Sequence, residues 1–214
     1  MNVVRKVRNV LRGLVQRYGP AKLKQYLWNH EFATGHWMCL ENTAGDYIYP
    51  HLEKWAKQGS ILDLGCGPGN TGNELKDSAY RSYIGVDISD VAVEKARARS
   101  GENNRSAKNS YFQSDIYSYV PPKQFDVVLF GDSLYYIPPP KIAGMLDRYA
   151  AYISKDGVFM ARMYDMRGKF KIIIDIIEEN FEVLEKHVYD SQVCVIVFRA
   201  HAVSRLAQVA GQRA

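Results

Sequence analysis

The chain has 214 residues, of which 47% are hydrophobic and 24% are charged, values that are ordinary for one globular domain. Its three cysteines, Cys39, Cys66 and Cys194, are an odd number without zinc-like spacing, which argues against a disulfide framework and a zinc site and fits a reducing, cytoplasmic setting. The net charge is +5, yet residues 1–30 carry seven cations and no acid, which leaves −2 for the rest of the chain. No run approaches the roughly 18 apolar residues of a membrane span.

The first 18 residues place valines and leucines at helical three-and-four spacing, with the cations between them. This pattern predicts a basic amphipathic helix, which Gly19 and Pro20 end, and a second short helix over residues 21–28. The cations are either a solvated face or a binding surface for an anionic acceptor or a membrane. Because the second helix folds back, we expect the apolar stripe of the first one to pack on the domain.

Residues 29–42 are rich in histidine, tryptophan and glycine without a clear period, which is typical of an ordered loop, and a helix is expected over residues 45–57. The next stretch, residues 60–72, reads as a strand over residues 60–64, a tight turn and a helix, with glycines at positions 65, 67 and 69. Alternate glycines let a ligand approach the main chain closely. The loop is therefore a predicted cofactor site, but Asn70 stands where a dinucleotide loop needs its third glycine.

Three predicted strands end in or near carboxylates. Asp63 precedes the glycines, Asp87 follows 20 residues after Gly67, and Asp115 follows a third apolar run. An interval of about 20 residues is the one at which an acid meets a ribose in nucleotide-binding units. These side chains are expected at one edge of a parallel sheet.

The second half of the chain alternates strands and helices. We expect strands over residues 125–130 and 157–163 and helices over residues 73–78, 90–99, 141–154 and 170–180, with a polar loop over 101–109. The strands at 181–187 and 193–199 are joined by so short a turn that they must pair antiparallel.

Three motifs together resemble those of class I S-adenosylmethionine-dependent methyltransferases: LDLGCGPG at 62–69, GVDIS at 85–89 and FDVVLF at 125–130. The resemblance implies an α/β fold, a Rossmann-like doubly wound sheet of seven strands, mostly parallel with a C-terminal antiparallel hairpin. It also implies three parts of the chain: basic N-terminal helices and a lid over 1–43, the methyltransferase domain over 44–200 and a tail over 201–214.

The implied cofactor is S-adenosyl-L-methionine, with S-adenosyl-L-homocysteine as the product. Its expected binding residues are Asp63, Gly65, Cys66, Gly67, Gly69, Asp87, Ile88, Asp115, Ile116 and Gly131. No metal site is expected, because only one acid, Asp132, stands at the exit of the fourth strand, where metal-dependent methylation would need several.

Methyl transfer to a hydroxyl needs a group that removes a proton. Asp132 is the first candidate, with the capping of a turn as its alternative. In such enzymes the segment before the first strand commonly folds over the cofactor, which makes Trp37 a candidate lid and substrate-binding residue and His36 a second candidate base. A core position is the alternative for Trp37.

The LYY segment at 134–136 discriminates between acceptors. Enzymes of the family that methylate exocyclic amines of bases usually carry Asn/Asp-Pro-Pro-aromatic here, whereas Tyr135 and Tyr136 resemble the segments of small-molecule and saccharide methyltransferases. We therefore expect a small-molecule or saccharide acceptor, anionic or lipid-linked. A nucleic-acid target through the basic arm, peripheral membrane contact, and a non-catalytic adenosyl-binding protein are the alternatives.

Overall fold

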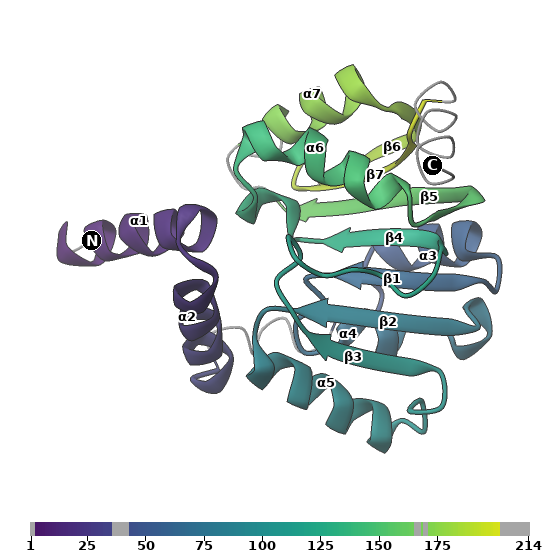
Figure 1. The fold of residues 1–214 in the computed structure, drawn as a ribbon, viewed down its shortest axis with the longest axis horizontal. Helices are drawn as coiled ribbons and strands as arrows, with labels where there is room; N and C mark the ends of the chain where they lie inside the picture. The colour runs from purple at the N-terminus through teal and green to yellow at the C-terminus, as the bar shows by residue number, and fades with distance from the viewer. Residues whose placement is uncertain (1–2, 36–42, 165–167, 169–170, 202–214) are drawn as a thin grey trace, which may run out of the picture.

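A sheet in the strand order β3-β2-β1-β4-β5-β7-β6 organises the protein (Figure 1). The structure is a computed structural model that describes residues 3–35, 43–164, 168 and 171–201. Its strands are β1 (Ser60–Leu64), β2 (Ser82–Asp87), β3 (Asn109–Gln113), β4 (Phe125–Gly131), β5 (Ile153–Tyr164), β6 (Glu182–Tyr189) and β7 (Val193–Arg199). The first five run parallel, and β7 pairs antiparallel with both β5 and β6. The predicted fold class is confirmed.

Helices cover both faces of the sheet, because alternate side chains of its buried strands are apolar on both sides. Leu62 and Leu64 of β1 share a buried cluster with residues of α6 and α7, whereas Ile61 shares one with residues of α3 and α5. The helices are α3 (Ile48–Ala56), α4 (Asn70–Glu74), α5 (Asp90–Glu102), α6 (Pro139–Ala150) and α7 (Lys171–Asn180). This doubly wound arrangement brings the carboxyl ends of β1 to β5 to one edge of the sheet.

Some predicted boundaries were wrong. The helix predicted at residues 73–78 begins at Asn70 and ends at Glu74, and a separate 3₁₀ turn follows at Asp77–Ala79. Helix α6 ends at Ala150, four residues before its predicted end, because β5 already pairs with β4 at Ile153. The pairing of β5 with β4 shifts register between Phe125 and Val127, whose partners are Ile153 and Val158, and sequence periodicity does not indicate such a shift.

Two N-terminal helices, α1 (Val3–Tyr18) and α2 (Ala21–Ala33), form an arm that stands beyond the carboxyl edge of the sheet (Figure 1). Helix α2 is held on the domain by two bonds: the Ser89 hydroxyl donates to Asn29 Oδ1 at 2.7 Å, and Lys95 Nζ donates to the Phe32 carbonyl at 2.9 Å. The arm therefore lies over the edge at which the strands end.

The apolar stripe of α1 does not pack on the domain, and that expectation was wrong. Leu11 and Leu14 are 57% and 49% exposed, and Val7, Val10 and Tyr18 are exposed as well. The inward side of the helix is polar instead: Gln16 donates to Glu31 at 3.1 Å, and Arg17 donates to the Tyr135 carbonyl at 3.0 Å. Among the described helices, none is long and apolar enough to cross a membrane.

Candidate active site

A cavity of about 550 Å³ lies between the carboxyl edge of the sheet and the arm. Twelve of the predicted site residues line it: Asp63, Gly65, Cys66, Gly67, Asp87, Ile88, Asp115, Ile116, Gly131, Asp132, Tyr135 and Tyr136. Gly69 is not part of the wall, and His36 and Trp37 lie outside the described residues. The topology thus gathers side chains that are up to 73 positions apart in the sequence, from Asp63 to Tyr136.

The glycine loop follows β1 with backbone conformations that favour glycine. Gly65 has a φ of 87°, and a Cβ there would stand 2.6 Å from the Ser133 Cβ, so a side chain does not fit. Gly67 has a φ of 52°, and a Cβ there would lie 3.6 Å from the Phe32 ring, which is ordinary van der Waals contact. At Gly69 a Cβ would meet Ala96 of α5 at 2.6 Å, which makes this glycine a contact between helices and not a wall of the cavity.

Asp63 is a buried carboxylate with one unsatisfied oxygen. Its Oδ2 accepts a hydrogen bond from the Tyr83 hydroxyl at 2.5 Å, whereas Oδ1 accepts none within the described part of the chain. Burial raises the pKa of Asp63 to about 7, and the Tyr83 bond opposes that shift. A buried oxygen without a donor is suited to a cationic or hydrogen-bonding group of a ligand.

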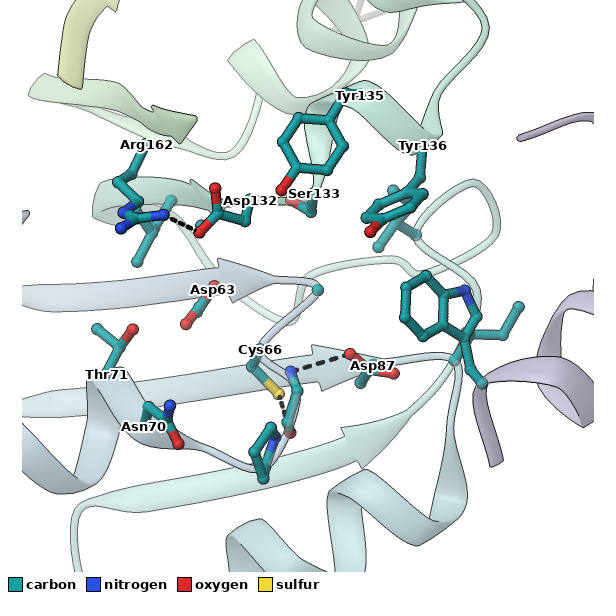
Figure 2. Close-up of a pocket in the computed structure, with 18 of the residues that line it drawn as sticks. Asp63, Cys66, Asn70, Thr71, Asp87, Asp132, Ser133, Tyr135, Tyr136 and Arg162 are labelled. Atoms are coloured by element: carbon teal, nitrogen blue, oxygen red, sulfur yellow. Dashed lines mark hydrogen bonds and ion pairs between the residues drawn. The ribbon is translucent and has the colours of Figure 1, made fainter. Parts of the chain in front are cut away.

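Asp87 joins the end of β2 to the glycine loop (Figure 2). Its carboxylate accepts the Gly67 N–H at 2.9 Å and the Ser89 N–H at 2.8 Å. Burial raises the pKa of Asp87 to about 6, and the backbone N–H donors oppose that shift. The carboxylate keeps acceptor capacity toward the cavity, because two oxygens offer about four lone-pair sites.

Asp115 and Ile116 form the wall beyond β3. The Tyr117 N–H donates to Asp115 Oδ1 at 2.9 Å, which fixes the carboxylate in the turn after the strand. Lys24 of α2 reaches the same region, where its ammonium stands 5.3 Å from the centre of the Tyr117 ring. Burial lowers the pKa of Lys24, and the charge of Asp115 opposes that shift.

At the exit of β4, Asp132 takes part in a chain of ions that the sequence did not indicate. Its backbone φ is 53°, and its carboxylate accepts the Tyr164 N–H at 2.9 Å and pairs with the Arg162 guanidinium (Figure 2). Arg162 also pairs with Asp46 at 2.7 Å. Burial raises the pKa of Asp132, and Arg162 opposes that rise.

Aromatic side chains close the cavity on the side of the arm. Trp28 of α2 contacts Tyr136 edge-on, with 4.9 Å between the ring centres, and Phe32 lies one helical turn away. Sequence reasoning missed Trp28, Phe32, Asp46 and Arg162. The two aromatic residues are four positions apart in a helix whose end was placed too early, and the ions are 116 positions apart, so no local pattern joins them.

One cluster of metal-binding residue types lies outside the cavity, although no metal was expected. Single ligand atoms of His51, Glu185 and His187 all lie within 4.8 Å of one another. The His51 Nδ1 is 3.3 Å from Glu185, and its Nε2 is 2.9 Å from the Tyr189 hydroxyl. None of these four side chains lines the cavity.

Comparison with known proteins places residues 61–157 in a family described as a methyltransferase domain. Among curated relatives, the mRNA cap guanine-N(7) methyltransferase of Schizosaccharomyces pombe is 28% identical over 123 residues, which are 51% of this chain and 34% of the relative. The ubiquinone biosynthesis O-methyltransferase of Neisseria meningitidis serogroup A is 25% identical over 151 residues, 70% of this chain and 61% of the relative. The matched part is less than two thirds of either relative.

Solved structures share the fold. The N-methyltransferase NodS from Bradyrhizobium japonicum WM9, in complex with S-adenosyl-L-homocysteine, has a TM-score of 0.65 at 16% identity and covers 82% of this chain and 97% of its own. The magnesium protoporphyrin IX methyltransferase from Synechocystis, with S-adenosylmethionine bound, has a TM-score of 0.58 at 16% identity and covers 90% and 96%. At these identities the likeness concerns the fold.

Proposed function

The chain belongs to the class I S-adenosylmethionine-dependent methyltransferases, and on this premise we propose that it transfers a methyl group from that cofactor to a hydroxyl or amine of a small molecule or saccharide. The observation that carries the proposal is one cavity with two chemically different ends. One end holds the glycine loop with Asp63 and Asp87, and the other holds Asp132, Tyr135 and Arg162. A cofactor and an acceptor fit end to end in such a space, as in-line transfer requires.

The first end fits an adenosyl cofactor on this chain's own residues. Asp63 Oδ1 offers a buried, unpaired oxygen to the ammonium of an amino-acid moiety, and Asp87 offers acceptor sites to ribose hydroxyls. Gly67 lines the cavity, and Asp115 in the same wall would accept a hydrogen bond from the exocyclic amine of adenine. When bound, S-adenosylmethionine supplies an electrophilic methyl group on a sulfonium sulfur.

At the second end we propose that Asp132 takes the proton of the acceptor. An acceptor hydroxyl loses its proton to the Asp132 carboxylate, its oxygen forms the bond to the methyl carbon, and the carbon–sulfur bond breaks to leave a neutral thioether. Arg162 holds the carboxylate in place, and Tyr135, in the same cavity wall, orients the acceptor. His36 remains a predicted second base, and Trp37 a predicted substrate contact.

The decisive experiment is turnover of S-adenosylmethionine labelled in its methyl group against a panel of saccharides, amines and lipid-linked sugars. Transfer of label to a hydroxyl or amine supports the proposal. Tight cofactor binding without transfer to any member of the panel would favour the alternative, an adenosyl-binding protein that has lost catalysis. Including a short capped RNA in the panel tests a further alternative.

That further alternative is an RNA acceptor, which the names of two relatives favour. One is the mRNA cap enzyme described above; the other is the ribosomal RNA small subunit methyltransferase C of Haemophilus influenzae, 29% identical over 138 residues that are 64% of this chain and 38% of the relative. The basic arm supplies charge for a phosphate backbone. The LYY segment with Tyr135 and Tyr136 argues for a smaller acceptor.

A cytoplasmic location stays a prediction.

A further inference from the structure

The first helix of the arm has an exposed apolar face with cations on either side of it. We propose that this helix docks the protein on an anionic lipid surface. We define the apolar stripe as Val7, Val10, Leu11, Leu14 and Tyr18. The docking itself does not depend on the proposed function. Its consequence, that the acceptor is carried in the lipid surface, does rest on that function.

The stripe forms one continuous face of α1, because its members are spaced by three, one, three and four positions. Each is exposed by 49% to 60%. Val7 and Leu11 also line an apolar groove between α1 and α2. The α2 side of this groove includes Leu23 and Leu27. An amphipathic helix of this kind lies in the plane of an interface with its apolar face inserted.

The charges of α1 select the chemistry of that interface. The helix contains no acid, and two of its four described cations, Lys6 and Arg8, are exposed next to the stripe. On α2, the exposed Lys22 adds a further positive charge, whereas the acid Glu31 is 5% exposed and already bonded to Gln16. The accessible surface of the arm therefore presents positive charge around apolar side chains.

Two other partners, a nucleic acid and a second copy of the chain, would match either the charge or the apolar stripe of this surface, but not both. A nucleic acid would neutralise the cations but leave the stripe in water, because its backbone offers no apolar area. A second copy of the chain would cover the stripe, but an isologous contact would bring the cations of one α1 against those of the other. An anionic lipid interface answers both needs, since it has headgroup charge above an apolar layer.

The arm links this surface to the cavity. Gln16 belongs to the cavity wall, and Arg17, the next residue, donates to the carbonyl of Tyr135, whose side chain is also in that wall. The same helix thus contacts the acceptor end of the cavity at its last turn and presents the stripe along its length. Docking brings the cavity next to molecules held in the lipid surface.

The test is co-sedimentation of the full chain with vesicles of phosphatidylcholine and phosphatidylglycerol, compared with phosphatidylcholine alone. We expect binding to the anionic vesicles that falls at least about tenfold in neutral vesicles or at high salt, because salt screens headgroup charge. The double variant Leu11→Ser/Leu14→Ser should lose binding by a similar factor, and Lys6→Gln/Arg8→Gln should lose most of its salt dependence.

The matched control is Val120→Ser/Ile172→Ser, which changes two equally exposed apolar side chains outside the arm, 66% and 52% exposed. It should bind vesicles as the parent chain does. Circular dichroism and cofactor titration show that each variant is folded.

Three results would overturn the docking: equal sedimentation of the parent chain and the Leu11→Ser/Leu14→Ser variant, binding to single-stranded RNA in place of vesicles, or a parent dimer that this variant dissociates. The acceptor is tested separately, by turnover with the same acceptor in detergent solution and in vesicles. Vesicle binding without any transfer would leave the docking in place and count against the proposed function.

Discussion

Asp87 connects the second strand to the glycine loop, and removal of its carboxylate tests its role in cofactor binding. We expect Asp87→Ala to weaken the binding of S-adenosylmethionine by about 1.5–3 kcal/mol, the scale of a hydrogen bond to a charged group. Calorimetric titration measures this. As a control, Asp156→Ala removes an exposed carboxylate near the start of β5, at the other end of the strand from the cavity. This variant should bind the cofactor with unchanged affinity. An Asp87→Ala variant that binds as tightly as its parent would refute the assignment.

The buried carboxylates also predict how cofactor affinity depends on pH. An ammonium ligand favours the ionised form of Asp63, whose pKa is raised to about 7 by burial, so binding releases a proton wherever that group is protonated beforehand. The affinity should therefore fall as the pH is lowered from about 7.5 to about 5.5, by at most about tenfold per unit for each proton.

The control for this pH effect is Asp63→Asn, which should bind more weakly and lose part of the slope, with the remainder coming from Asp87. Titration in two buffers of different ionisation enthalpy counts the released protons.

The stability of the unliganded protein depends on pH in the opposite direction from the cofactor affinity. The native state binds more protons than the unfolded chain below pH 7, so the contribution of Asp63 to stability is lost as the pH rises through its raised pKa of about 7.

Asp132 and Asp46 allow proton transfer to be separated from the positioning of Arg162, because both carboxylates pair with this guanidinium. We expect Asp132→Asn to lower kcat by roughly 100-fold or more, the scale of general-base catalysis, and to leave cofactor affinity within about twofold. Asp46→Asn loosens the same arginine and should lower kcat much less. Equal losses in the two variants would show that Asp132 acts only by holding Arg162.

Among the helices, α5 carries the cap that ties the arm to the domain. The fully buried Ser89 accepts the Ala92 N–H at 3.1 Å and donates to Asn29 of α2. Ser89→Ala should lower the free energy of unfolding by about 1 kcal/mol, as removal of a helix N-cap does. Denaturant unfolding measures this, with the exposed Ser106→Ala as control. If the two variants unfold alike, the cap has no energetic role.

The elements themselves differ in how far the sequence predicts them. Strand β1 was predicted at Ser60–Leu64 with both ends correct, because a fully buried strand is an apolar run that glycine ends sharply. The period of α1 was also read correctly, but not its orientation. Periodicity identifies an apolar face without identifying what covers it, and here Gln16 and Arg17 turn toward the domain while the stripe faces away.

On the scale of the whole molecule, the candidate site was predictable where it follows from topology. Parallel strands end at one edge, so the residues after β1, β2, β3 and β4 had to meet there. The contacts of Arg162 with Asp132 and Asp46 were not predictable, because they depend on the register of β5 with β4 and on a segment before α3. Such pairs join distant parts of the chain and leave no local pattern.

The position of β7 has a consequence for how the protein is made. Although β7 follows β6 in the sequence, it lies between β5 and β6, with six of its seven residues buried. Until Val193–Arg199 has left the ribosome, β5 therefore has an open edge and β6 has no neighbour in the sheet. At that stage the unpaired strand edges favour pairing with other chains. The sheet is complete only when Val193–Arg199 has paired with both β5 and β6.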